Sequence, residues 1–335
     1  MDMLPDTKHP GETDEDHLHF FADYEPPTDD FLTDVVEGLS HAQKTLSPKY
    51  FYDQKGSVLF DEICRAPEYY ITRTELELLD SVLPEVATLT GPEAIVIEWG
   101  SGSSWKIRKV LDALERPAEY IAIDISSDHL KAAAAEIAKQ YPGVKVGAIC
   151  ADFLAPIHLP DEAIVSEGRR LGFLPGSTIG NFEPAVAAEI LERATGLLES
   201  GGALLIGTDL QKSEEILLAA YNDAGGVTAA FNLNILERMK AELKAEIDVS
   251  AFKHQALYNQ KNHRIEMHLR ATRPTEIRVS GHSFAFKAGE SIHTENSHKF
   301  TVEGFQQIAR DAGFEPSEVW TDKDGLFALH YLTLP

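Results

Sequence analysis

Apolar runs alternate with amphipathic segments through the middle of the chain, between about residues 94 and 208. Each run is short and nearly continuous, as is typical of a strand buried on both faces of a parallel sheet. The segments between the runs carry apolar residues at helical spacing. We predict five parallel strands with helices between them, ending near Glu98, Asp124, Cys150, Leu174 and Gly207. This repeating order indicates a Rossmann-like α/β sheet.

The pattern changes after Asp209. Two helical segments, ILLAAYNDA and FNLNILERMKAEL, precede three stretches in which apolar and polar residues alternate: FKHQALYNQ, RIEMHLRAT and IRVSGHSFAF. A period of two indicates antiparallel strands. A helix, TVEGFQQIARDAG, and two strands, PSEVWTD and LFALHYLTL, then follow. We therefore expect an α+β insertion at about 212–299 that interrupts the α/β core.

The N-terminal region differs from both parts. Residues 1–27 are acidic and rich in proline, which predicts a flexible tail. An amphipathic helix, DDFLTDVVEGL, begins the ordered part, and Thr72 and Glu75 have the spacing of a helix capping box. We expect one domain from residues 28–73 plus 212–299, and a second from residues 74–211 plus 300–335.

Charge and cysteine content narrow the class of function. The formal net charge is −24, so a nucleic-acid backbone is a poor partner and a small substrate fits better. Cys64 and Cys150 are the only cysteines, which suits neither a disulfide framework nor a zinc site, and we expect no metal. The sequence shows no signal peptide or membrane-spanning run. A cytoplasmic protein is therefore expected, with a monomer favoured.

The first predicted strand runs into a glycine turn, Glu98-Trp99-Gly100-Ser101-Gly102. The dinucleotide fingerprint G-x-G-x-x-G is absent, because Trp105 stands at its third glycine position. An acid followed by two glycines suits S-adenosylmethionine (SAM), which has no pyrophosphate to place on a helix N-terminus. An ordinary tight turn is the simpler explanation of this motif alone.

Acids at the next two strand ends favour the SAM hypothesis. Asp124 ends the second strand, where doubly wound folds hold a ribose diol. Asp152 and Phe153 follow the third strand, and they suit the exocyclic amine and the ring of an adenine. Matched groups at three successive strand ends make SAM the expected cofactor.

Longer strings resemble one family. The strings FYDQKGSVLFDEICRAPEYYITRTE, FLPGSTIGNF, AYNDAGGVTAAFN and ESIHTENSHKF are similar to the histidine-specific Nα-methyltransferases of ergothioneine biosynthesis. The likeness extends in order through about residues 40–335. It implies a SAM-binding methyltransferase core and a substrate domain built from the N-terminal segment and the insertion. The implied reaction is Nα-methylation of L-histidine, with three successive transfers that give hercynine.

The resemblance also implies individual site residues. The substrate imidazole would lie between Glu295 and Ser297, with Asn296 between them in the chain. The amine and carboxylate would be held by Asn181, Tyr69 and Tyr221, and Tyr52 would lie near the methylated nitrogen. Asn181 and Tyr52 are thus the candidate catalytic residues. The implied SAM contacts are Gly100, Lys106, Asp124, Asp152 and Phe153.

Other interpretations stay open from the residues alone. Asn181 could cap the helix that follows it, and the tyrosines could be aromatic side chains between two domains. The substrate could instead be tryptophan or a prenylated tryptophan. An indole offers a single N–H to Glu295 and Ser297, however, so this pair favours an imidazole. A third possibility is a SAM-binding regulatory protein without catalysis.

Overall fold

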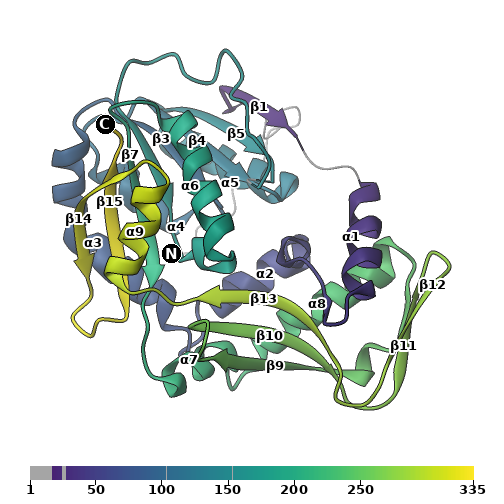
Figure 1. Cartoon of the computed structure of the whole chain (residues 1–335). Helices are drawn as coiled ribbons and strands as arrows, with labels where there is room; N and C mark the ends of the chain where they lie inside the picture. The colour runs from purple at the N-terminus through teal and green to yellow at the C-terminus, as the bar shows by residue number, and fades with distance from the viewer. Residues whose placement is uncertain (1–16, 25–27, 103, 153) are drawn as a thin grey trace, which may run out of the picture.

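The computed structural model of the chain describes residues 17–24, 28–102, 104–152 and 154–335. Its largest unit is an eight-stranded sheet with the order β1-β5-β4-β3-β6-β7-β15-β14 (Figure 1). These strands are β1 (Phe20–Asp23), β3 (Ile95–Trp99), β4 (Glu119–Asp124), β5 (Lys145–Cys150), β6 (Arg170–Leu174), β7 (Ala203–Asp209), β14 (Glu315–Thr321) and β15 (Phe327–Thr333).

The sheet is parallel from β1 to β7, and β15 and β14 add an antiparallel edge. The predicted α/β core is therefore confirmed, including its five parallel strands and the final strand pair. The chain proceeds from β3 through β4 to β5 on one side, and then through β6 to β7 on the other. Ligands of such sheets bind at this reversal, outside the carboxyl ends of the strands.

Helices cover both faces of the large sheet. The helices α3 (Tyr70–Thr90), α4 (Trp105–Ala113) and α5 (Ser127–Gln140) share one hydrophobic core, which includes Val96 of β3. The helices α6 (Pro184–Leu198) and α9 (Val302–Asp311) pack in a second core with Ile97. Successive strand residues point to opposite faces, which explains why a continuous apolar run serves both cores.

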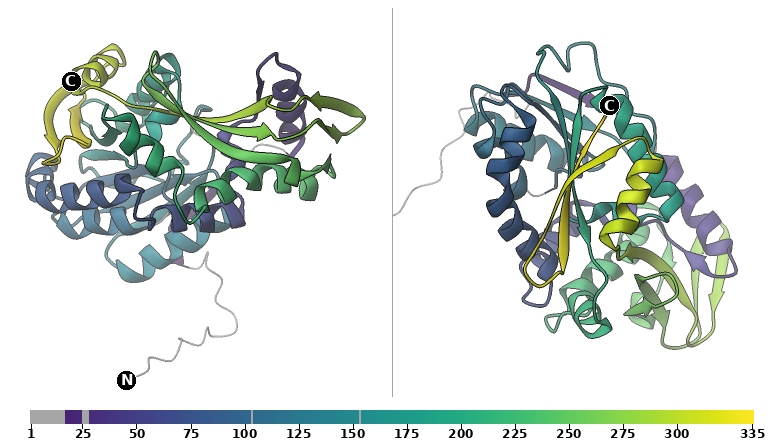
Figure 2. Two further views of the ribbon diagram at one scale, coloured as in Figure 1. Left: turned by 90° about the horizontal axis from the view of Figure 1, so that it is seen from below. Right: turned by 60° about the vertical axis from the view of Figure 1, so that its left-hand side comes forward.

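A smaller part extends away from the large sheet, as the green ribbons of Figure 2 show. One of its sheets has the order β2-β13-β10-β9 and the other β12-β11-β8. Their strands are β2 (Lys44–Thr45), β8 (Glu246–Ile247), β9 (Phe252–Asn259), β10 (Arg264–Ala271), β11 (Thr275–Val279), β12 (His282–Phe286) and β13 (Ser291–His298). The accompanying helices are α1 (Thr28–Ser40), α2 (Gln54–Ile63), α7 (Glu214–Tyr221) and α8 (Val227–Glu242). Helix α8 packs against both α2 and β9, which joins the N-terminal segment to the insertion.

A β-bulge in β13 decides which side chains face the large sheet. Met267 of β10 pairs with Glu295, whereas His268 pairs with His293, so Thr294 is an extra residue without a partner position. The Thr294 hydroxyl is buried, and lies 2.8 Å from Asn232 Oδ1 of α8. An extra residue reverses the alternation of side chains beyond it. Glu295 and Ser297 therefore face the side opposite to His293.

The structure corrects three predictions. Within the predicted flexible tail, Phe20–Asp23 form β1, which pairs in parallel with β5, while residues 1–16 and 25–27 lie outside the described part. The stretch IRVSGHSFAF is a hairpin of β11 and β12 rather than one strand. Helix α3 begins at Tyr70, so Thr72 is no cap. Glu75 lies within that helix and is completely buried in the protein, where its carboxylate accepts the Gly176 N–H.

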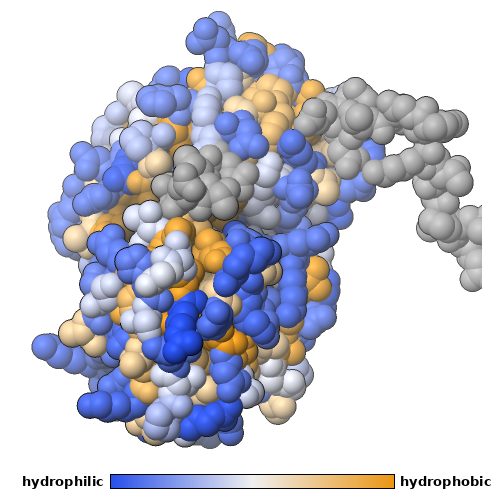
Figure 3. All heavy atoms as spheres, turned by 90° about the vertical axis from the view of Figure 1, so that its right-hand side faces the viewer, coloured by the Kyte–Doolittle hydropathy of each residue, from blue (hydrophilic) through white to orange (hydrophobic). Residues whose placement is uncertain are grey.

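Hydrophilic residues predominate on the face shown in Figure 3, and apolar residues gather near its middle, between the upper and lower parts. None of the helices in the described ranges has the length and apolar character needed to cross a membrane.

Candidate active site

A cavity of about 430 Å³ lies between the carboxyl ends of the parallel strands and the smaller part of the molecule. The loops after β3, β4, β5 and β6 form one wall, while α2, α7, α8 and β13 contribute the other. The predicted site residues that line it are Tyr52, Tyr69, Gly100, Asp124, Asp152, Asn181, Tyr221, Glu295, Asn296 and Ser297. Segments from opposite ends of the chain therefore converge on one space.

The glycine turn leaves room for a ligand against the backbone. Gly100 has a φ of 75°, and an added Cβ would meet no atom within 4 Å. At Gly102 the nearest such atom is 3.9 Å away. Both glycines line the cavity, so a side chain at either position would occupy ligand space.

Asp124 closes the floor of the cavity beside this turn. Its carboxylate accepts the N–H of Gly102 at 3.2 Å and that of Ser126 at 3.0 Å. Burial raises the pKa of Asp124, and these backbone N–H groups act in the opposite direction. The glycines, Asp124 and Asp152, which we predict to contact SAM, line one cavity with open backbone and hydrogen-bond acceptors.

Glu98, the acid of the motif, lies behind this wall rather than on it. Its side chain is buried and accepts the Tyr120 hydroxyl at 2.6 Å. Burial raises the pKa of Glu98 to about 8, while the bond from Tyr120 lowers it. Glu98 therefore bonds to the neighbouring strand β4 and does not line the cavity.

Lys106 is a predicted cofactor residue that is not part of the cavity lining. Lys106 Nζ lies 2.6 Å from Glu75, whose carboxylate also accepts the Gly176 N–H at 2.9 Å. Lys106 is thus connected to the loop after β6 through Glu75, and Gly176 of that loop lines the cavity. Phe153 lies outside the described residues.

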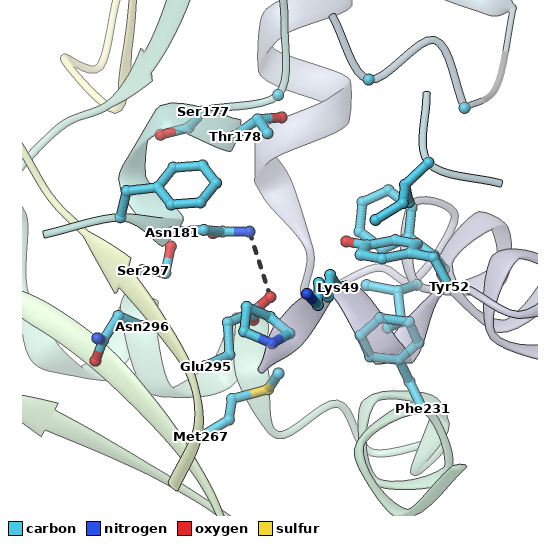
Figure 4. A pocket seen from close by; sticks show the side chains of 18 of the residues that line it. Lys49, Tyr52, Ser177, Thr178, Asn181, Phe231, Met267, Glu295, Asn296 and Ser297 are labelled. Atoms are coloured by element: carbon cyan, nitrogen blue, oxygen red, sulfur yellow. Dashed lines mark hydrogen bonds between the residues drawn. The ribbon is translucent and has the colours of Figure 1, made fainter. Parts of the chain in front are cut away.

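Asn181 reaches the cavity from the short helical turn η3 (Thr178–Asn181) after β6. The cap position of α6 belongs to Glu183, so Asn181 does not cap this helix. Its Nδ2 instead donates to Glu295 Oε1 at 3.4 Å, as the dashed line in Figure 4 shows. The side chain therefore faces the smaller part across the cavity.

Glu295 and Ser297 project from the same side of β13, and Asn296 turns the other way (Figure 4). The Asn296 amide donates to Glu183 at 3.3 Å, away from the other two side chains. Burial raises the pKa of Glu295 to about 8, and the Lys299 ammonium opposes this shift. A ring N–H in the cavity would donate to the Glu295 carboxylate, favour its charged form and so oppose the shift that burial causes.

Comparison with known proteins identifies the family of this chain. The family described as histidine-specific, SAM-dependent methyltransferases matches residues 31–334. The histidine N-alpha-methyltransferase of Mycolicibacterium smegmatis is 44% identical over 302 residues, covering 88% of this chain and 92% of its own. The protein of that name in Mycobacterium tuberculosis is 42% identical with the same coverage. The chain belongs to the histidine-specific, SAM-dependent methyltransferase family.

A more distant relative acts on a different amino acid. The 4-dimethylallyltryptophan N-methyltransferase of Claviceps purpurea is 25% identical over 324 residues, covering 90% of this methyltransferase and 94% of its own chain.

Aromatic rings surround the part of the methyltransferase cavity near Glu295. The Tyr52 ring meets Phe231 edge-on with ring centroids 5.6 Å apart, and Tyr69 meets Tyr221 in the same way at 6.3 Å. Burial raises the pKa of Tyr52 well above its ordinary value, and Glu295 adds to the shift. The Tyr52 phenol is therefore neutral at physiological pH.

Sequence reasoning missed two charged residues at this site. Lys49 lines the cavity, 2.9 Å from Asp34 and 3.9 Å from Asp152. Lys299 is fully buried behind the cavity, with its Nζ 2.7 Å from Asp209 at the end of β7. The sequence contained one signal for this ion pair, because Asp209 is another acid at a strand end. Its partner, Lys299, lies 90 residues later in the chain, and no local pattern joins the two.

Proposed function

We propose that the protein transfers methyl groups from SAM to the α-amine of L-histidine. The observation that carries this proposal is the position of Glu295 and Ser297, which face Asn181 across the cavity. The open glycine turn lies in the wall of the same cavity. The high identity to the mycobacterial histidine N-alpha-methyltransferases supports the same substrate.

The two side chains of β13 match the polar atoms of an imidazole ring. Glu295 accepts a hydrogen bond from the ring N–H, and the Ser297 hydroxyl forms a hydrogen bond with the second ring nitrogen. A site that buries such polar partners rejects amino acids without them, by up to about 10⁴-fold. An indole has a single N–H and no second ring nitrogen, so a tryptophan would offer no acceptor to the Ser297 hydroxyl proton.

Bound SAM supplies a methyl group on a positively charged sulfur, which only a neutral amine can accept. The Asn181 amide oxygen accepts an amine N–H and so holds the lone pair in a fixed direction. The neutral Tyr52 phenol beside it gives the amine a polar neighbour of no net charge, which favours the neutral amine over the ammonium form. Positioning of this kind can supply an effective molarity of about 10⁵ M or more.

The tyrosine-lined wall also suits a product with permanent positive charge. A quaternary ammonium gains roughly 0.5–2 kcal/mol from each favourable aromatic contact. Such contacts keep the mono- and dimethylated amines in the site, and we propose three successive transfers that end at hercynine, the trimethylated amine of the ergothioneine pathway.

We further propose two domains: residues 28–73 plus 212–299 bind the amino acid, and residues 74–211 plus 300–335 bind SAM. The packing of α8 against α2 supports this division. The division of the strands into one large and two small sheets supports it as well. Strand β1 pairs with the large sheet and would be part of the SAM-binding domain.

A panel of amino acids with SAM, followed by mass spectrometry of the products, tests the function. Histidine should be the best substrate and should gain three methyl groups on its α-nitrogen. Preferred methylation of tryptophan would contradict the imidazole assignment. The absence of any methylated product, with SAM binding retained, would favour a non-catalytic role.

A further inference from the structure

Lys299 sits directly behind the two hydroxyl groups of the proposed substrate site. Its side chain has no exposed surface, and its Nζ has three hydrogen-bonding neighbours. These are Asp209 Oδ2 at 2.7 Å, Ser297 Oγ at 2.8 Å and the Tyr221 hydroxyl at 3.1 Å. An ammonium has exactly three N–H donors, so this geometry uses all of them.

Asp209 keeps this lysine charged. Burial alone lowers the pKa of Lys299, but the Asp209 carboxylate outweighs burial and raises it above its ordinary value. Asp209 in turn accepts the Tyr70 hydroxyl at 2.8 Å and lies 2.5 Å from Lys212. The Asp209 carboxylate is thus held by three groups, and Lys299 is the one of them that also contacts the cavity wall.

The hydrogen bonds around Ser297 determine where its proton points. Lys299 is only a donor, so Ser297 Oγ accepts from it. The Tyr221 hydroxyl accepts another Lys299 N–H and donates its own proton to Ser297 Oγ at 2.7 Å. A serine hydroxyl has two acceptor lone pairs and one proton. With both lone pairs engaged, the Ser297 proton is directed toward the cavity that the residue lines.

We propose that Lys299, anchored by Asp209, is a positioning residue that fixes the Ser297 hydroxyl as a hydrogen-bond donor to the substrate. Ser297 then donates to the ring nitrogen that bears no hydrogen, and Glu295 accepts from the N–H of the other. The site thereby selects a neutral azole that offers one donor and one acceptor. This inference rests on the proposed function, since it names what distinguishes a histidine ring from other aromatic rings.

The variant Lys299→Met tests the proposal, with Lys212→Met as its matched control. Both lysines contact the Asp209 carboxylate, but only Lys299 contacts Ser297 and Tyr221. In Lys299→Met we expect the KM for histidine to rise about 10-fold or more, the effect of losing one fixed donor, with a smaller change in kcat. In Lys212→Met the KM for histidine should stay at its parental value.

A second substrate separates positioning from general damage to the fold. The pyrrole analogue of histidine keeps one ring N–H but has no acceptor nitrogen. Its kcat/KM should be nearly the same in the parent and in Lys299→Met, so that the preference for histidine over this analogue collapses. Equal losses for both substrates would overturn the proposal, because they would indicate a structural role only.

Two further variants keep the test decisive if Lys299→Met folds poorly. Asp209→Asn combined with Lys299→Met removes both buried charges, and this protein should show the same loss of preference. Ser297→Ala should abolish any further effect of Lys299→Met on the KM for histidine. Additive effects would overturn the proposal. Failure of the parental protein to methylate histidine would instead contradict the proposed function. If the parental protein is active and Lys299→Met has the same KM for histidine, only this inference is contradicted.

Discussion

The Nδ2 atom of Asn181 donates to Oε1 of Glu295 at 3.4 Å. Asn181 belongs to the loop after β6 of the large sheet, and Glu295 belongs to β13 of the smaller part. This contact joins opposite sides of the cavity at the place where we propose that the amine and the imidazole bind. The two ends of one histidine molecule would therefore be held by elements that are 114 residues apart in the chain.

Asn181→Ala should lower kcat/KM for histidine by about 1–3 kcal/mol and leave cofactor binding intact. The reason is that Asn181 would hold the amine, while the glycine turn and Asp124 hold SAM. Steady-state kinetics, with calorimetry of S-adenosylhomocysteine, measure the two effects separately. Asn262→Ala, at an exposed position, is the control. Turnover at the parental rate in Asn181→Ala would show that this side chain is only structural.

Asp124→Ala should weaken the binding of S-adenosylhomocysteine by about 1.5–3 kcal/mol, the scale of a charge-assisted hydrogen bond. Asp128, a few residues further on in α5, is exposed, so Asp128→Ala should bind the cofactor as the parent does. Isothermal titration calorimetry checks both proteins. Equal affinities of the two variants would count against a cofactor role of Asp124.

Glu295→Ala should reduce kcat/KM for histidine by about 2–4 kcal/mol, because the ring N–H would be buried without an acceptor. Glu290→Ala, just before β13 and exposed, provides the control. Full histidine activity of Glu295→Ala would rule out the imidazole clamp.

The double variant Glu295→Met with Ser297→Ala should shift the preference from histidine toward tryptophan. Both substitutions remove polar groups that an indole would have to desolvate. The ratio of kcat/KM for the two amino acids measures the shift. A ratio that still favours histidine as strongly as in the parent would mean that other residues recognise the ring.

Glu295→Gln should stabilise the ligand-free protein, and the gain should grow with pH. The pKa of Glu295 is raised from about 4.5 in the unfolded chain to about 8 in the folded protein. The folded state therefore binds more protons between these values, and the parent loses stability as pH rises through this window. Each pKa unit corresponds to about 1.4 kcal/mol. Thermal melts from pH 5 to pH 9 should show a difference that widens up to about pH 8, and a constant difference would contradict it.

Local patterns in the sequence are sufficient for the α/β core and for the cofactor wall. A strand buried on both faces must be apolar throughout, and its end must carry the turn and the acid that the ligand needs. The sequence alone therefore placed Asp124 and the two glycines at neighbouring strand ends, where they line the cavity, and their contact with SAM stays a prediction. The family resemblance is confirmed, and the roles of the individual substrate residues stay predictions until the variants are measured.

Only the tertiary structure decided which groups meet across the chain. The sequence places Glu295 and Ser297 on one strand face, but the bulge at Thr294, held by Asn232, turns that face toward the cavity. The spacing of Thr72 and Glu75 suggested a helix cap, whereas packing buries Glu75 beneath the Gly176 loop. The ion pair of Lys299 with Asp209 joins residues from distant segments. Spacing along a chain determines local turns and faces, but contacts between distant segments depend on how whole sheets and helices pack.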